Sequence, residues 1–171
     1  MSERHVSGIL YVCFLSESSG IEDGGEIYDR KTVTALRRDG TNVDVLSIRR
    51  SKKIGVPTWA SRIPTAKIRR IAAAKENGQK IILSHEGLFG INQEDSVDLI
   101  IVHNYFPAFL FASRPFVTAY YRLGAKSFFS KHFERANGIV FLSHRDMAAA
   151  RLDFPQIEMK SVSLPPPPFE S

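Results

Sequence analysis

Cysteine is nearly absent from this sequence, which has one, Cys13, among its 171 residues. A lone cysteine has no intrachain partner, so the chain does not belong to the small secreted proteins that disulfides hold together. The opening residues, MSERHVSG, show neither a cationic leader nor a small-residue cleavage site, so we expect no signal peptide. These features favour a cytoplasmic location.

Long hydrophobic runs are also lacking. The longest, residues 9–15 and 106–112, fall far short of the roughly 20 apolar residues that cross a bilayer. No transmembrane helix is therefore predicted. Hydrophobic residues make up 43% of the chain and charged residues 24%, as is typical of a folded protein, and the length suits one domain.

Acidic residues are missing from residues 49–75, which hold nine Lys or Arg within a chain of net charge +5. Such a stretch attracts phosphate groups on a nucleic acid, an anionic membrane or a ligand, although it could also be only a solvated face. The helix expected over residues 124–136 has phenylalanines on one face and basic residues on the other. The phenylalanines favour packing into the core or, alternatively, the helix is amphipathic and rests on an anionic membrane. The candidate anion-binding residues are Arg49, Arg50, Lys52, Lys53, Arg69, Arg70, Lys126 and Lys131.

Apolar strand-like runs alternate with helical patterns along the whole chain. This alternation predicts an α/β fold: a single Rossmann-like domain over residues 1–164, with a mainly parallel sheet and helices on both faces, followed by a proline-rich hinge or tail at 165–171. The expected strands are 9–15, 42–48, 80–84, 97–102, 116–121, 138–142 and 159–164, and the expected helices are 25–39, 64–77, 124–136 and 143–152.

The loop behind the first strand contains Gly20, Gly24 and Gly25 but matches neither phosphate-binding fingerprint. Its glycines do not have the G-x-G-x-x-G spacing of a dinucleotide site. A P-loop would need lysine and a hydroxyl residue where Glu26 and Ile27 stand. The glycine pair still lets a ligand approach the backbone, and the following helix offers free N–H groups to an anion. The same glycines could also form only a tight turn.

Two apolar strands end in a histidine. Residues 80–84 lead into His85, and residues 97–102 lead into His103. The carboxyl edge of a parallel sheet is where such folds carry their chemistry, so either imidazole could donate a hydrogen bond or act as an acid or base. Either could instead be structural. Neither has a Cys or His nearby at metal-binding spacing, so no metal site is expected.

Several segments, in order, resemble the start of GT-B glycosyltransferases of the family-4 type. They are the strand ILYVCFL, the loop end Gly24-Gly25-Glu26, the helix end ALRRDG, the strand VDVLSI and the later RANGIVFLS. The resemblance extends over the whole chain but covers only the amino-terminal half of that architecture. It implies an acceptor-side domain that faces a donor-binding domain across a cleft.

The resemblance also implies a function in polysaccharide or glycoconjugate biosynthesis. A sugar would pass from a nucleotide-sugar co-substrate, without a metal cofactor, to a glycan or lipid-linked acceptor. Separately, the basic residues named above could attract the protein to the inner face of the membrane as a peripheral protein. Because the sequence stops at the hinge, we expect no transfer without a donor-binding domain or subunit. The site residues implied are His103 or its rival His85 for catalysis, Gly24, Gly25 and Glu26 beside the donor diphosphate, and Glu86, Asn104, Tyr105 and Tyr120 in the cleft. A further alignment places Tyr120 at the histidine position.

Two other functions fit parts of the sequence. A non-enzymatic module could use the basic face to bind nucleic acid or a membrane, although no aromatic-basic RNA motif is visible. An NADP-dependent reductase could hold the extra phosphate with Arg49 and Arg50, but it would need the glycine fingerprint that the chain lacks.

Overall fold

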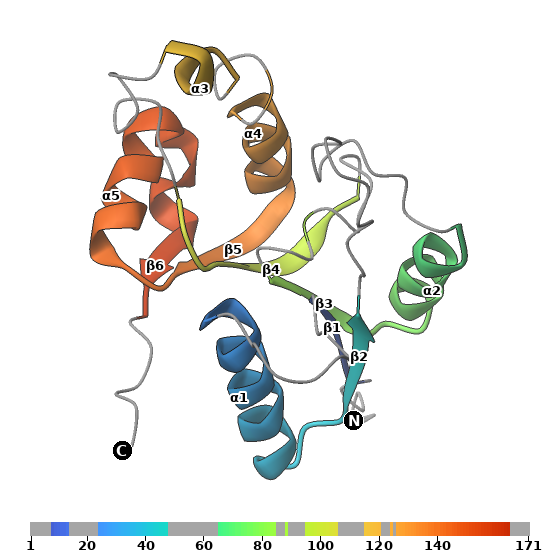
Figure 1. Cartoon of the computed structure of the whole chain (residues 1–171). Coiled ribbons are helices and arrows are strands. Elements are labelled where there is room, and N and C mark those ends of the chain that lie inside the picture. The colour runs from blue at the N-terminus through green and yellow to red at the C-terminus, as the bar shows by residue number, and fades with distance from the viewer. Residues whose placement is uncertain are drawn as a thin grey trace. The chain divides into compact units, whose positions relative to one another are not determined.

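The computed structural model of the chain describes residues 8–13, 24–47, 65–84, 88, 95–105, 115–120, 124 and 126–164. They fall into two compact units, Met1–Asn92 and Gln93–Ser171. Figure 1 shows the elements of both units.

The first unit is built on parallel strands with β1 in the middle. β1 pairs with β2 on one side and with β3 on the other. The crossover from β1 to β2 and the crossover from β2 to β3 run in opposite directions across the sheet. Because such crossovers are right-handed, α1 and α2 lie on opposite faces of this sheet, as Figure 1 shows. The elements are β1 (Ile9–Cys13), α1 (Gly24–Arg38), β2 (Val43–Ser47), α2 (Thr65–Glu76) and β3 (Lys80–Ser84).

A glycine follows each helix of the first unit, close to the helix ends predicted at residues 39 and 77. Gly40 and Gly78 have φ values of 83° and 70°, a left-handed conformation that costs glycine little. The Gly40 N–H donates to the Arg37 carbonyl and the Gly78 N–H to the Lys75 carbonyl, so helix-end carbonyls are satisfied. These caps turn the chain sharply into β2 and β3.

The second unit repeats the parallel arrangement in the order β4, β5, β6. Both of its crossovers run in the same direction across the sheet, so α4 and α5 share one face. The ring of Phe133 on α4 contacts those of Phe141 on β5 and Phe154 after α5, with centroids 6.1 Å and 5.4 Å away. The elements are β4 (Val97–Val102), α3 (Pro115–Tyr120), α4 (Lys126–Arg135), β5 (Ala136–Phe141), α5 (His144–Asp153), the 3-10 helix η5 (Pro155–Lys160) and β6 (Ser161–Ser163).

Helix α4 passes into β5 without any connecting residue, because the helix ends at Arg135 and the strand begins at Ala136. The Lys160 ammonium donates to the Glu134 and Ala136 carbonyls, both at 2.9 Å. Burial lowers the pKa of Lys160, and the charge of Glu134 opposes that shift. One lysine thus satisfies carbonyls on both sides of the joint.

Two further side chains hold the end of the second unit. The Ser143 hydroxyl accepts a hydrogen bond from the Asp146 N–H at 3.4 Å, so Ser143 caps the start of α5, close to the helix start predicted at residue 143. The Arg151 guanidinium donates to the Ser161 hydroxyl at 2.9 Å and to the Ser161 carbonyl at 2.6 Å. It also donates to the Glu158 carbonyl at 3.1 Å, so it ties α5 to both η5 and β6.

The predicted α/β class with Rossmann-like parallel strands is confirmed, since each strand pairing within the two units is parallel. The strands predicted at 80–84 and 97–102 have those bounds in the structure. The proline-rich tail, 165–171, lies outside the described residues.

Two element predictions are wrong. Residues 116–121 were expected as a strand from their aromatic and β-branched composition, but Pro115–Tyr120 is helical. Pro115 fits the first turn of a helix, where its fixed φ is suitable and its missing N–H costs nothing. The strand expected at 159–164 is shorter than predicted, because η5 extends to Lys160 and leaves only Ser161–Ser163 as β6.

Candidate functional site

The carboxyl end of β1 and the start of α1 define one candidate site, in the first unit. Gly24 and Gly25 open α1, one residue earlier than predicted. Glu26 lies in the first turn, where a carboxylate interacts favourably with the helix dipole. Its side chain is buried, however, with 4% exposed. Glu26 therefore belongs to the interior of the unit rather than to its accessible surface.

A buried polar pair lies beneath α1. The Tyr11 hydroxyl, on β1, donates to Asp29 Oδ1 at 2.7 Å, and both residues are almost fully buried. Burial, followed by the charge of Asp29, raises the pKa of the Tyr11 phenol above its ordinary value. The phenol is thus a neutral hydrogen-bond donor to the Asp29 carboxyl.

Cys13 extends this polar interior to the end of β1. Burial, and then the negative charge of Asp29, raises the pKa of its thiol to about 12. A thiol that stays protonated is a poor nucleophile and a poor metal ligand, so Cys13 is not a reactive cysteine at neutral pH.

Ser84 ends β3, the strand beside β1. Because Val12 pairs with Leu83, continuing the register places Ser84 next to Cys13 on the α1 side of the sheet. Its hydroxyl is buried and has no hydrogen-bond partner among the residues that the structure describes. Leaving a buried hydroxyl without a partner is costly, so a water molecule or a ligand group would stabilise this position.

The sequence analysis did not single out Tyr11, Asp29 or Ser84. Ile27, Tyr28, Ala35 and Leu36 recur at helical spacing and would predict an apolar stripe on this helix, but the structure buries Glu26, Asp29 and Val33 instead. Their spacing is equally helical. Two of these three inward-facing residues are carboxylates, and this pattern in the sequence would have indicated a polar interior beneath the helix.

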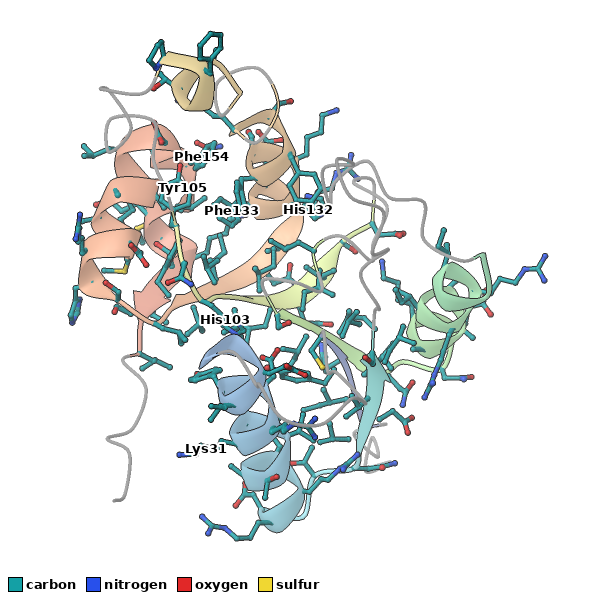
Figure 2. The ribbon with its side chains drawn as sticks, viewed as in Figure 1. Lys31, His103, Tyr105, His132, Phe133 and Phe154 are labelled. Carbon is teal, nitrogen blue, oxygen red and sulfur yellow. The ribbon has the colours of Figure 1, made fainter. Side chains whose placement is uncertain are left out.

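The end of β4 forms the second candidate site, in the second unit. His103 follows β4 directly and is half-buried, Asn104 is exposed, and Tyr105 is buried with 1% exposed. The Tyr105 ring packs edge-on against Phe129, with centroids 5.8 Å apart, and against Phe154 at 6.2 Å. Figure 2 shows Tyr105, Phe133 and Phe154 gathered in this aromatic cluster.

The hydroxyl of Tyr105 reaches a charged pair. It donates to Asp153 Oδ2 at 2.7 Å, while the Lys126 ammonium donates to Asp153 Oδ1 at 3.1 Å. Lys126 also lies over the Phe154 ring, 5.7 Å from its centroid. Tyr105 therefore supports the interior of the unit, and its assignment to a cleft stays a prediction. Lys126 is likewise engaged within the unit, although its side chain is 41% exposed.

The aromatic face of α4 packs into the unit, in line with the core-packing interpretation. His132 and Phe133 are buried, and Phe128 and Phe129 are half-buried. His132 Nδ1 lies 2.9 Å from the Phe128 carbonyl, one helical turn earlier. Lys131 is exposed on the same helix. Arg69 and Arg70 are exposed on α2 of the first unit.

The structure brings only some of the predicted site residues into view. Gly24, Gly25 and Glu26 are consecutive at the start of α1, and His103, Asn104 and Tyr105 are consecutive after β4. Tyr120 ends α3, but the description does not extend to its side chain. The other predicted residues lie outside the described part of the chain: His85, Glu86, Arg49, Arg50, Lys52 and Lys53.

Within the residues that the structure describes, no three His, Cys, Asp or Glu side chains form a group that could hold a metal ion. None of the helices described there is both long and apolar enough to cross a membrane.

A scan against protein-family models finds no match to this chain, and a search of curated proteins finds none either.

Proposed function

We propose that the chain is the amino-terminal, acceptor-side domain of a GT-B glycosyltransferase. Completed by a donor-binding domain or subunit, it would transfer a sugar from a nucleotide-sugar to a glycan or lipid-linked acceptor. The observation that carries the proposal is the position of His103, which directly follows the parallel strand β4 at the carboxyl edge of the sheet in its unit. Ligands of open α/β sheets bind at that edge.

His103 has the chemistry that sugar transfer requires. A half-buried imidazole can donate a hydrogen bond to a sugar hydroxyl or ring oxygen, or accept a proton from an acceptor hydroxyl. Its backbone follows a fully paired strand segment, because Val102 pairs with Phe141. The resemblance in sequence offers this histidine, with His85 and Tyr120 as the rival positions, for contact with the transferred sugar.

The start of α1 supports the proposal separately. The first-turn N–H groups of a helix have no intrahelical acceptors, and here the helix opens with Gly24 and Gly25, which have no side chains to block an approaching ligand. Such groups stabilise a diphosphate as negative charge develops on it during transfer. The buried Glu26 side chain and the nearby Asp29 limit how deep an anion could enter.

The test supplies the donor-binding domain that the proposal requires. The chain is combined with the product of the downstream or neighbouring reading frame, and labelled nucleotide-sugars are incubated with a membrane lipid extract as acceptor. We expect label in the lipid or glycan fraction, and a loss of about 100-fold or more in His103→Ala, as for removal of a positioned acid, base or donor. His144→Ala, a change at an exposed histidine of α5, is the matched control. Transfer that His103→Ala leaves intact would contradict the assignment of the histidine.

A nucleotide titration separates the proposal from the reductase. Binding of nucleotide-sugars without binding of NADPH supports a transferase, whereas NADPH fluorescence transfer with no response to nucleotide-sugars would support the reductase. Retention on DNA or RNA that falls steeply with salt would favour the nucleic-acid module.

We also propose that the basic faces attract an anionic membrane, where a lipid-linked acceptor would be found. The described residues that support this are Arg69 and Arg70, exposed on α2, and Lys131, exposed on α4. Each basic residue near an anionic surface contributes about 1 kcal/mol. Co-sedimentation with anionic vesicles should therefore weaken by about tenfold or more in Arg69→Glu/Arg70→Glu. Equal binding to neutral vesicles would refute this part of the proposal.

A further inference from the structure

We infer that Asp153 is a positioning residue for His103, acting through the hydroxyl of Tyr105. This inference deepens the proposed function and rests on it for the role of His103 in transfer. The physical coupling between Asp153 and the His103 segment does not depend on that role and can be measured separately.

The segment after β4 is anchored at two points that lie close together in sequence. On one side, Val102 belongs to the β4–β5 ladder, and its carbonyl accepts a hydrogen bond from the Leu142 N–H at 3.3 Å. On the other side, the Tyr105 ring is 1% exposed and packs against Phe129 and Phe154. Only His103 and Asn104 lie between the anchors.

Such a short connection leaves little conformational freedom. Each residue contributes two soft backbone dihedrals, so the path between the anchors depends on those of His103 and Asn104. A shift of the Tyr105 anchor must therefore be absorbed by these two residues. The imidazole of His103 moves with them.

The carboxylate of Asp153 links the Tyr105 anchor to Lys126, with one oxygen bonded to each residue. Oδ2 accepts from the Tyr105 hydroxyl at 2.7 Å, and Oδ1 accepts from the Lys126 ammonium at 3.1 Å. The lysine fixes the carboxylate, and the carboxylate fixes the phenol. Because Asp153 is the last residue of α5 and Lys126 the first of α4, the anchor joins both helices to the segment that carries His103.

The coupling can be measured by NMR on the full chain with ¹⁵N-labelled histidine. The chain has five histidines, and His103→Gln assigns the His103 signal by its disappearance. The test variants are Tyr105→Phe and Asp153→Asn. The matched controls are Tyr28→Phe, a half-buried tyrosine of α1, and Asp39→Asn, an exposed aspartate that follows α1.

Both test variants should shift or split the His103 ring signals while leaving those of His144 unchanged. The amide of Asn104 should exchange with solvent about tenfold faster, since one hydrogen bond to a charged acceptor is lost. Lys126→Met, which keeps the stem of the side chain, should give a smaller change in the same direction. It also provides a folded variant if Asp153→Asn proves unstable.

His103 signals that coincide with the wild type in Tyr105→Phe and Lys126→Met would overturn the inference, even if the melting temperature falls, because the network would then be merely structural. In the transfer assay, Asp153→Asn should lower kcat with little change in KM. A chain that shows the NMR coupling but transfers no sugar when combined with the donor-binding protein refutes the proposed function alone. Full transfer without the coupling refutes the positioning role alone.

Discussion

Replacing Tyr11 with phenylalanine tests the buried polar pair of the first unit most directly. The change removes one oxygen and leaves the ring, so no sizeable cavity forms. It deprives the Asp29 carboxyl of a donor at 2.7 Å, at a site where Asp29 is 1% exposed and water cannot easily replace the lost hydroxyl.

The expected cost follows from the type of bond. Hydrogen bonds to charged groups contribute about 1.5–3 kcal/mol, compared with about 1 kcal/mol for neutral pairs. We therefore expect Tyr11→Phe to lower the free energy of unfolding by about 2 kcal/mol. In a chain of this size that corresponds to a fall of about 4–8 °C in Tm.

Urea unfolding followed by far-ultraviolet circular dichroism measures this change. Tyr28→Phe is the control, because it removes a hydroxyl from a half-buried tyrosine on α1 whose partner, Thr32, is neutral. Its cost should be about 0.5–1 kcal/mol. The m-values of all variants should agree, which would show that the same transition is being compared.

A double-mutant cycle with Asp29→Ala isolates the pair. The coupling free energy between Tyr11 and Asp29 should be about 1.5–3 kcal/mol, although each single change also includes its own packing cost. A coupling below about 0.5 kcal/mol, or a Tyr11→Phe variant no less stable than Tyr28→Phe, would refute the argument that the Tyr11 hydroxyl stabilises a charged Asp29.

Three further changes follow from the same structure. Above pH 9, the thiol of Cys13 ionises in the unfolded chain but stays protonated in the folded chain, where its pKa is raised to about 12. This difference should lower the free energy of unfolding by about 1.4 kcal/mol per pH unit. Alkaline unfolding of Cys13→Ala should lack this contribution, and an identical pH slope would contradict it. Lys160→Met should cost about 1 kcal/mol in thermal unfolding, because two helix-end and strand carbonyls lose their donor; Lys131→Met, at an exposed site on α4, should change almost nothing. Arg151→Lys keeps the positive charge but loses the guanidinium that donates two hydrogen bonds to Ser161. Amide hydrogen exchange in β6 should therefore become about tenfold faster. Unchanged exchange would show that β6 does not depend on Arg151.

The elements that sequence analysis located well are those with clear local boundaries. Residues 80–84 and 97–102 are apolar runs with polar or glycine residues beside them, and both are strands with the expected bounds. Ser143 has the side chain that a helix start needs, and it caps α5. In each case the signal and its cause lie within a few residues of each other.

The misplaced elements depend on interactions that composition does not record. Residues 116–121 have the composition of a strand, but Pro115 opens a short helix there. The segment before β6 remains a 3-10 helix as far as Lys160, whose side chain reaches the end of α4. In this second case a contact between residues distant in sequence overrides local propensity.

The same distinction applies to the candidate sites. The position of His103 at the end of β4 could be predicted, because a strand and the residue after it are adjacent in sequence. The role of Asp153 could not, because its hydrogen bond to Tyr105 joins residues 48 apart. Asp29 was likewise hidden until the inward face of α1 was known.

The direct passage from α4 into β5 also limits how this protein can change. With no residue between Arg135 and Ala136, the joint has no slack to absorb a change in length. One inserted residue would move β5 by one position and turn Ile139 and Phe141 to the opposite side of the sheet. Relatives of this protein should therefore vary in length at their loops but keep this junction constant. A peptide tag or a circular permutation should be placed anywhere but here.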